Sequence, residues 1–174
     1  MSKVLELLKT RRSIRKFAGT TVSDDLINKV TTAGQFAASG RGKQSAVIVV
    51  IKDPAYKEQI RKLNATIMGK DEAFDPFYGA SVYILVAALK EVPTHVYDGT
   101  LVLANMMIEA HALGLGSCWI HRAKESMDYP LYQEIFKKLG IEGEYEGIGH
   151  LALGYAATAP MEAAPRKEHF VYTL

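Results

Sequence analysis

The sequence predicts an α+β fold in which a mixed β-sheet is covered by helices on both faces, a three-layer arrangement. Residues 101–113 form a helical segment that is apolar on nearly all sides, which is typical of a helix packed in an interior. Residues 46–51, 81–89 and 117–120 are short apolar runs with the composition of strands. The segments alternate, but without the regular βαβ spacing that would favour a doubly wound parallel sheet.

Each helix expected in the N-terminal half starts at a recognisable cap. Ser2 and Ser23 are N-cap candidates for helices that begin at residues 3 and 24. Asp53 followed by Pro54 is a typical start for a third helix, with proline in the first turn. The stripe that the second helix would bury consists of Leu26, Val30, Ala33 and Ala37.

Strands and breaks follow from the apolar runs and the glycines. The run 46–51 should be buried on both faces, as should 81–89. Residues 64–79 are expected to be irregular. Gly114 is placed to end the apolar helix, which then leads into a central strand over 117–120. Gly140 ends a helix, and residues 148–153 form a last strand. The tail from residue 156 cannot form a core alone, so it should cross the domain or reach a partner.

Composition excludes several classes of protein. The length of 174 residues suits a single domain over 1–174. The net charge of +2 is too small to indicate a partner that is a nucleic acid or a membrane. Cys118 is the only cysteine, and the five histidines lack the spacing of metal ligands, so we expect neither a disulfide nor a metal site. The N-terminal residues do not resemble a signal peptide, which favours a cytoplasmic protein.

Two short segments match parts of nucleotide-binding motifs, but their context excludes both interpretations. Residues 147–152 match G-x-G-x-x-A, but they begin a strand and no acidic residue follows at the required distance. Residues 42–45, Gly-Lys-Gln-Ser, resemble the end of a phosphate loop, yet the earlier glycine is missing and the order is helix to strand. We therefore expect neither a dinucleotide fold nor a nucleoside triphosphatase.

Two segments are candidates for chemistry. Residues 11–16, Arg-Arg-Ser-Ile-Arg-Lys, either complement a helix C-terminus or bind an anion through arginine forks and a hydroxyl. Residues 39–44 are either a solvated loop or an edge where glycine lets the backbone approach a flat ring. Cys118 is more simply explained as core than as a nucleophile, and the basic pair at 166 and 167 as solvated charges.

Taken in order, five segments resemble the FMN-dependent nitroreductase family over essentially the whole chain. They are residues 11–17, residues 37–45, residues 75–80, the stretch from Asp98 through Asn105 to Ile120, and Gly154-Tyr155 followed by Pro165-Arg166-Lys167. The resemblance implies a three-layer sandwich with a mostly antiparallel sheet, and a homodimer with FMN at the subunit interface. The C-terminal tail would extend onto the partner subunit.

The resemblance also implies a set of cofactor-binding residues. Arg11, Arg12 and Ser13 would hold the phosphate, closed by Arg166 and Lys167, with Arg15 near the flavin pyrimidine. The loop with Ser39, Gly40, Gly42, Lys43 and Gln44 would line the ribityl chain and ring, with Asn64 a weaker candidate. Trp119, Ile120 and His121 would reach the flavin from the other subunit.

The implied activity is electron transfer from NADH or NADPH through FMN to a small-molecule acceptor, such as a nitroaromatic compound or a quinone. The cofactor carries the chemistry, so no catalytic side chain is required, and one flavin face used in turn predicts ping-pong kinetics. Two alternatives remain: a member specialised for dehalogenation or ring modification, and a non-catalytic protein that binds or stores flavin. Ala38, Gly42 and Ser45 replace the Pro, Asn and Pro of the commoner family pattern, and the chain lacks extra pocket-capping helices.

Overall fold

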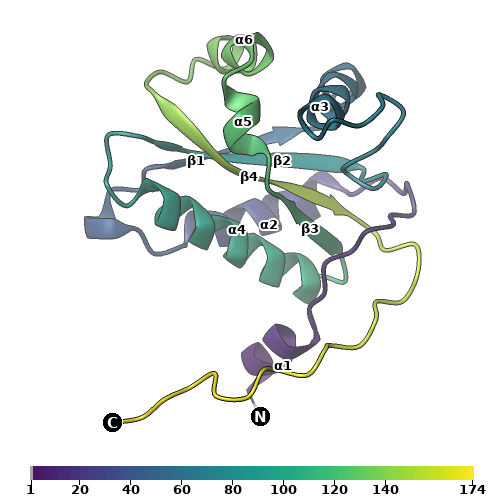
Figure 1. The fold of residues 1–174 in the computed structure, drawn as a ribbon, viewed down its shortest axis with the longest axis vertical. Coiled ribbons are helices and arrows are strands. Elements are labelled where there is room, and N and C mark those ends of the chain that lie inside the picture. The colour runs from purple at the N-terminus through teal and green to yellow at the C-terminus, as the bar shows by residue number, and fades with distance from the viewer. Residues whose placement is uncertain (1) are drawn as a thin grey trace.

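A four-stranded sheet forms the middle layer of the structure, a computed structural model that describes residues 2–174 (Figure 1). The strand order is β1-β2-β4-β3, and all three ladders are antiparallel. The strands are β1 (Ala46–Ile51), β2 (Val82–Leu89), β3 (Gly116–Ile120) and β4 (Tyr145–Gly154). Among the described residues, the one parallel pairing is an isolated bridge between Ser13 and Ser117.

Helices cover both faces of this sheet (Figure 1). One face carries α2 (Asp24–Gln35) and α4 (His95–Ala112), and the other carries α3 (Pro54–Ile67), α5 (Ala123–Met127) and α6 (Pro130–Leu139). A separate cluster of buried apolar side chains lies on each face. The helix α1 (Lys3–Thr10) and the C-terminal tail project away from these layers. The expected three-layer α+β sandwich is confirmed.

The predicted caps are present. The side chains of Ser2 and Ser23 accept hydrogen bonds from the N–H groups of the first turns of α1 and α2. Asp53 does the same for α3, which has Pro54 in its first turn. Gly140 ends α6 in the left-handed region, with φ of 67°. These contacts explain why local sequence predicts where the helices begin and end, because each cap satisfies backbone groups that the helix leaves unpaired.

Three expectations about position were wrong. β1 lies at an edge of the sheet and Val50 is 36% exposed, so this strand is not buried on both faces. β3 is also an edge strand rather than a central one. Helix α3 continues to Ile67, so the irregular segment begins after residue 67 and not at residue 64. A run of apolar residues indicates a strand but contains no information on which strands become its neighbours.

The buried stripe of α2 differs in part from the expectation. Ile27, Val30 and Gly34 are buried, whereas Leu26, Ala33 and Ala37 are only half-buried. A Cβ on Gly34 would lie 2.9 Å from Met106 Cγ and 3.1 Å from Val102 Cγ1. Glycine therefore lets α2 pack closely against α4, and this close approach turns the helix towards residues 27, 30 and 34.

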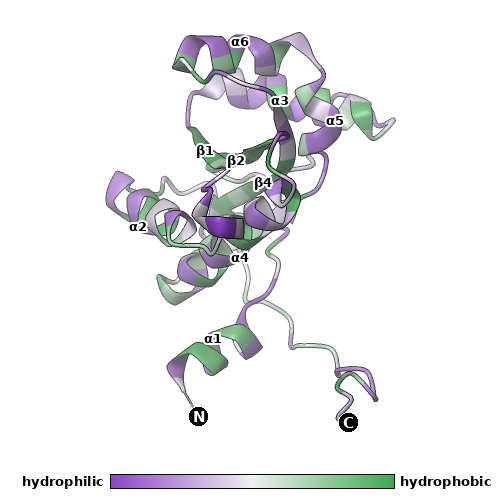
Figure 2. Ribbon diagram, turned by 90° about the vertical axis from the view of Figure 1, so that its left-hand side faces the viewer, coloured by the Kyte–Doolittle hydropathy of each residue, from purple (hydrophilic) through white to green (hydrophobic). Residues whose placement is uncertain are grey.

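The apolar helix α4 is not buried all round. One face packs on the sheet, but Tyr97 is 71% and Leu101 is 44% exposed on the outside. Helix α1 has no buried residue, and its Val4, Leu5 and Leu8 are exposed. The hydrophobic residues of α1 are visible in Figure 2 on a helix set apart from the body of the protein. We call these five residues the open apolar face.

Candidate functional site

The segment that follows α1 is fixed against one corner of the sheet. The N–H of Ile14 donates to the carbonyl oxygen of Ser117 in β3 (2.9 Å), and the N–H of Ala157 donates to that of Lys16 (3.0 Å). The N–H of Phe17 donates to the carbonyl oxygen of Tyr78. Residues 11–16 therefore lie between the start of β3, the start of the tail and the loop that precedes β2.

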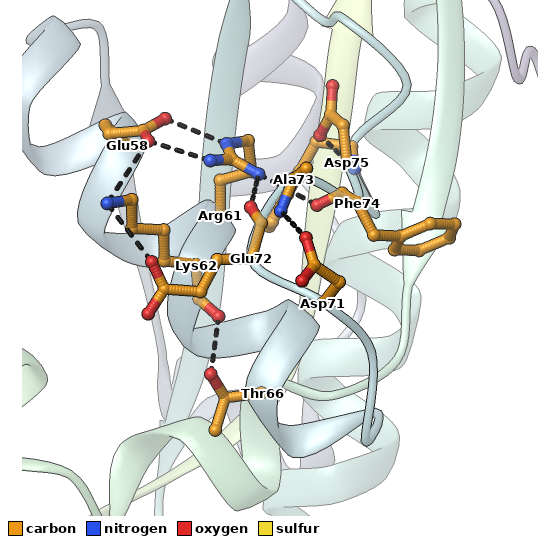
Figure 3. A network of polar contacts seen from close by, with 10 residues as sticks. Glu58, Arg61, Lys62, Thr66, Asp71, Glu72, Ala73, Phe74 and Asp75 are labelled. Atoms are coloured by element: carbon orange, nitrogen blue, oxygen red, sulfur yellow. Dashed lines mark hydrogen bonds and ion pairs between the residues drawn. The ribbon is translucent and has the colours of Figure 1, made fainter.

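That loop is itself held in shape by a polar network on α3 (Figure 3). The guanidinium of Arg61 forms an ion pair with Glu58 (2.7 Å) and donates to the carbonyl oxygens of Glu72 and Phe74. Further along, the carboxylate of Asp75 accepts hydrogen bonds from two backbone N–H groups of the turn before β2. Residues 11–16, which we call the arginine segment, therefore lead into Phe17, which contacts a loop fixed by hydrogen bonds.

Arg11 and Arg12 line a cavity of about 210 Å³ together with His111, the start of β3 and tail residues Ala156 and Pro160. We call it the arginine pocket. Arg12 Nη1 donates to the carbonyl oxygen of Lys9 (2.9 Å), but the buried atoms Arg11 Nη1 and Arg12 Nε have no hydrogen-bond partner. Two buried cationic N–H groups without acceptors fit an anionic ligand. The anion interpretation of residues 11–13 is the one that this geometry favours.

The second predicted segment, residues 39–44, forms a short 3₁₀ turn, η1 (Gly40–Gly42), at the N-terminal end of α4. We call it the glycine loop. Arg41 and Gln44 have positive φ values of 54° and 48°, a region that residues with a Cβ seldom adopt. The loop lines a cavity of about 240 Å³ together with Asp98 and parts of α2, β1 and α4.

Asp98 anchors the glycine loop. Its carboxylate accepts hydrogen bonds from the N–H of Gly40 (2.9 Å), the hydroxyl of Ser45 (2.8 Å) and the hydroxyl of Thr94 (3.1 Å). Burial alone would raise the pKa of Asp98, but these hydrogen bonds together outweigh burial and hold the pKa below its usual range. A buried carboxylate with three donors is a strong constraint on a loop that contains strained residues.

The two predicted segments do not meet within one chain. The glycine loop contacts Asp98 in the first turn of α4, whereas the arginine pocket contains His111 in its last turn. The rise of an α-helix separates those two positions by about 20 Å. The candidate site residues of the arginine segment and of the glycine loop therefore lie near opposite ends of α4.

Trp119, Ile120 and His121 lie on the arginine side of this division. They follow Ser117, which is bridged to Ser13 in the same chain. This places the strand that contains Trp119 beside the segment after α1 of the same chain, and the assignment of residues 119–121 to the flavin of the other subunit stays a prediction. Cys118 is buried beside them, and burial raises the pKa of its thiol, which agrees with a core residue rather than a nucleophile.

Other candidates lie away from both segments. Asn64 is fully buried under α5, where its amide donates to the carbonyl oxygen of Ile60 and to the hydroxyl of Ser126. Asn64 does not line the cavity at either segment, and its assignment to the cofactor stays a prediction. Arg166 and Lys167 are exposed in the tail, and their recorded contacts are with Ala164 and Phe170.

The rejected motif at residues 147–152 lies inside β4, as expected. A Cβ on Gly149 would come within 2.6 Å of Trp119 Nε1, so this glycine serves sheet packing and not a nucleotide. Among residues 2–174, no group of His, Cys, Asp and Glu side chains is placed to hold a metal ion. In the same part of the chain, no helix combines the length and apolar character needed to cross a bilayer.

Sequence reasoning missed the roles of two residues. Asp98 was noted in the sequence without a function, and His111 was not considered. Each acts through a contact distant in sequence, Asp98 with Gly40 and His111 with Thr10. No local signal identifies such pairs, although a histidine in the last turn of a helix is a weak indication of a cation site.

Comparison with known proteins identifies the family of the chain. Residues 8–155 match the model of the Nitroreductase family, and the chain belongs to that family. A protein from Archaeoglobus fulgidus named as an NADH dehydrogenase/NAD(P)H nitroreductase is 29% identical over 165 residues, covering 89% of this chain and 86% of that protein. A protein of the same name from Methanothermobacter thermautotrophicus is 32% identical over 121 residues, 67% of this chain, and the match spans 59% of its length.

A solved structure supports the fold independently. The crystal structure of a nitroreductase from Bacteroides fragilis, which contains bound FMN, superposes with a TM-score of 0.88. The likeness covers the whole of both chains at 24% sequence identity. It establishes that this chain has the nitroreductase fold.

Proposed function

We propose that this protein is an FMN-dependent oxidoreductase that takes electrons from NADH or NADPH and delivers them to a small-molecule acceptor, such as a nitroaromatic compound or a quinone. The observation that carries the proposal is the arginine pocket, where two buried guanidinium N–H groups lack acceptors beside the edge of β3. A ribityl phosphate supplies the missing acceptors. Family membership and the FMN in a related crystal structure support the choice of flavin.

The FMN site would be completed by a second copy of the chain. One chain separates the arginine pocket from the glycine loop by the length of α4, and the open apolar face lies on α4 and α1. Two copies related by a two-fold axis, packed through this face with their α4 helices antiparallel, would bring the glycine loop of one copy to the arginine pocket of the other. Exposed apolar patches of this kind mark interaction surfaces.

The C-terminal tail fits the same arrangement. Residues 157–174 are exposed and include Phe170, Val171 and Tyr172, whereas β1 leaves one edge of the sheet unpaired. An extended tail from the second copy can add to such an edge. It would also carry Arg166 and Lys167 from the exposed position seen in one chain towards a phosphate held by Arg11 and Arg12.

The roles of the residues follow from charge and position. Arg11 and Arg12 would hold the phosphate. Trp119 and Ile120 at the edge of β3, with His121 directly after the strand, would offer backbone groups to the ring. Arg15, or Lys43 from the other copy, places a cation where negative charge develops on the reduced ring, which favours reduction. When bound, FMN supplies the redox chemistry by accepting a hydride from the nicotinamide and passing electrons to the acceptor, so that donor and acceptor use one face in turn with ping-pong kinetics.

A mixing experiment tests whether the site is shared between copies. The variant Arg11→Glu disables the arginine pocket, and the variant Lys43→Glu, Gln44→Glu places acidic side chains on the exposed glycine loop. Each variant alone should lose FMN, as measured by flavin fluorescence in titrations. After unfolding and refolding together at equal concentrations, about half of the dimers carry one of each chain, and one of their two sites is intact.

Recovery of about a quarter of the wild-type FMN sites in the mixture is the expected result. If the mixture binds no more FMN than the separate variants, the two segments do not form one site. A third sample, in which each variant is refolded alone, controls for losses during refolding, and sedimentation analysis of all three samples reports whether dimers are present.

A further inference from the structure

The arginine pocket contains a third group that can carry positive charge. His111 lies in the last turn of α4 and lines the pocket with Arg11 and Arg12. The carbonyl groups at the C-terminal end of a helix favour a cation in this position. The function proposed above gives no role to His111, and nothing in its spacing from other histidines indicates a metal ligand.

The hydrogen bonds around His111 favour one assignment of the proton on its ring nitrogens. The hydroxyl of Thr10 donates its single hydrogen to the carbonyl oxygen of Glu6 (2.8 Å). The same oxygen lies 2.8 Å from His111 Nε2 and has only its lone pairs left for that contact. With the hydroxyl hydrogen on Glu6, Nε2 carries a hydrogen, and Nδ1 is the atom that gains a proton when the imidazole becomes charged.

The protein groups around His111 disfavour the charged form of its imidazole. Burial lowers the pKa of His111 below its usual value, and the positive charges of Arg11 and Arg12 lower it further. These two arginines, from the segment after α1, are the charged groups that act on the ring. The start of β3 and the tail face the pocket with uncharged residues, among them Leu115, Ser117 and Pro160.

We propose that His111 is a titratable third cation of the phosphate site, so that FMN binding takes up a proton at this histidine. This rests on the proposed function, because it assigns the arginine pocket to the phosphate. A phosphate dianion placed among Arg11, Arg12 and His111 reverses the electrostatic effect on the imidazole: the two arginines are neutralised, and a negative charge faces the ring. The protonated form then gains a charge-assisted contact that the neutral form lacks.

The sign of the pH dependence follows from linkage. Between the pKa of His111 in the free protein and its higher pKa in the complex, each binding event takes up a proton, so affinity for FMN falls as pH rises through that range. Above the higher pKa the imidazole stays neutral in both states and the dependence ends. Riboflavin, which has the same ring and ribityl chain but no phosphate, should not show this component.

The test compares wild-type protein with His111→Gln, whose side-chain amide can still donate to Thr10 but cannot take a proton. Dissociation constants for FMN and riboflavin would be measured between pH 5.5 and 8.5, with proton uptake obtained from calorimetry in two buffers of different ionisation enthalpy. We expect the FMN affinity of the wild-type protein, relative to the variant, to fall several-fold as pH rises from 6 to 8, with tenfold as the limit for a pKa shift of about one unit. The second ionisation of the phosphate itself affects both proteins and cancels in the comparison.

The outcomes distinguish this inference from the proposed function. Tight FMN binding with the same pH profile and proton uptake in both proteins would overturn the role of His111 and leave the FMN site standing. Absence of FMN binding by the wild-type protein at every pH would overturn both. A thermal unfolding curve for His111→Gln shows whether the variant is folded, and the pH dependence of the His111 ring proton resonances, with and without FMN, gives a second readout that does not require the variant.

Discussion

Replacing Asp98 tests whether the glycine loop is held in a preformed shape. The carboxylate is buried and accepts three hydrogen bonds, from Gly40, Ser45 and Thr94. In Asp98→Ala all three donors lose their acceptor, and the N–H of Gly40 has no other partner within the described hydrogen bonds. The loop, in which Arg41 and Gln44 have positive φ values, would then relax to conformations of lower strain.

The expected magnitude follows from the bonds that are removed. A hydrogen bond to a charged group contributes about 1.5–3 kcal/mol, but three that share one carboxylate are not additive, and Ser45 and Thr94 can turn towards water. We therefore expect Asp98→Ala to lower the free energy of unfolding by about 3 kcal/mol. Asp98→Asn keeps the shape and one good acceptor, so it should cost about 1–2 kcal/mol. Ser45→Ala, the matched control that removes a single bond, should cost about 1 kcal/mol.

The assay is urea unfolding of the protein without cofactor at pH 7, followed by FMN titration of each variant. Asp98→Ala should lose the most stability, Asp98→Asn less and Ser45→Ala the least. If the shape of the loop matters for the flavin, the loss of FMN affinity should follow the same order. Acid should reproduce part of the effect: because the pKa of Asp98 is lowered in the folded state, its contribution is present above the unfolded value of about 3.9 and is lost as pH falls below it. An unfolding free energy for Asp98→Ala within about 0.5 kcal/mol of wild type, the range of ordinary surface substitutions, would refute the anchor.

Four further predictions concern the rest of the fold. Gly149→Ala should lower the free energy of unfolding by about 1–3 kcal/mol, because the new Cβ would lie 2.6 Å from Trp119 Nε1; unchanged urea stability would contradict this packing. Ser23→Ala should cost about 1 kcal/mol and Ser23→Asp much less, since the cap of α2 is kept; equal losses would exclude the cap. Burial lowers the pKa of His150 to about 3, so stability should fall as pH drops from about 6.5 towards 3, by up to about 1.4 kcal/mol per unit, and the slope should be smaller in His150→Gln. Leu8→Asp on the exposed side of α1 should shift sedimentation from dimer to monomer while the circular dichroism spectrum stays the same; an unchanged dimer would place the interface elsewhere.

Features that the sequence encodes locally could be predicted. The caps at Ser2, Ser23 and Asp53 and the stop at Gly140 each depend on a residue type within one turn of its partner. The arginine segment could be proposed as an anion site for the same reason, because its charges are adjacent in sequence. The three layers followed from the apolar runs together with their irregular alternation.

Features that depend on partners distant in sequence could not be predicted. β1 lies at an edge of the sheet because it pairs with β2 alone. Nothing in the sequence of residues 46–51 indicates that edge position. Helix α4 was expected to be buried because it is apolar all round, whereas its outer face, with Tyr97 and Leu101, is open in one chain. The same composition suits a helix that packs on its own sheet with one side and on a second copy with the other.

The division of the site between the two ends of α4 also lay beyond the sequence. Residues 11–13 and 39–44 were grouped because a single cofactor was expected to contact both. The distance between them depends on the length and direction of α4, and on Asp98 and His111 being at its opposite ends. Only a folded chain contains that information, and it is the basis of our proposal that two copies make one site.

The central claim is that the protein passes electrons from a nicotinamide nucleotide through bound FMN, and a visible absorption spectrum tests it most directly. The purified protein, loaded with FMN and kept without oxygen, would be mixed with NADH or NADPH and then with a quinone or a nitroaromatic compound. The account predicts a flavin spectrum that bleaches with at least one nucleotide and returns when the acceptor is added. A protein that takes up no FMN, or whose bound FMN is not bleached by either nucleotide, would contradict it.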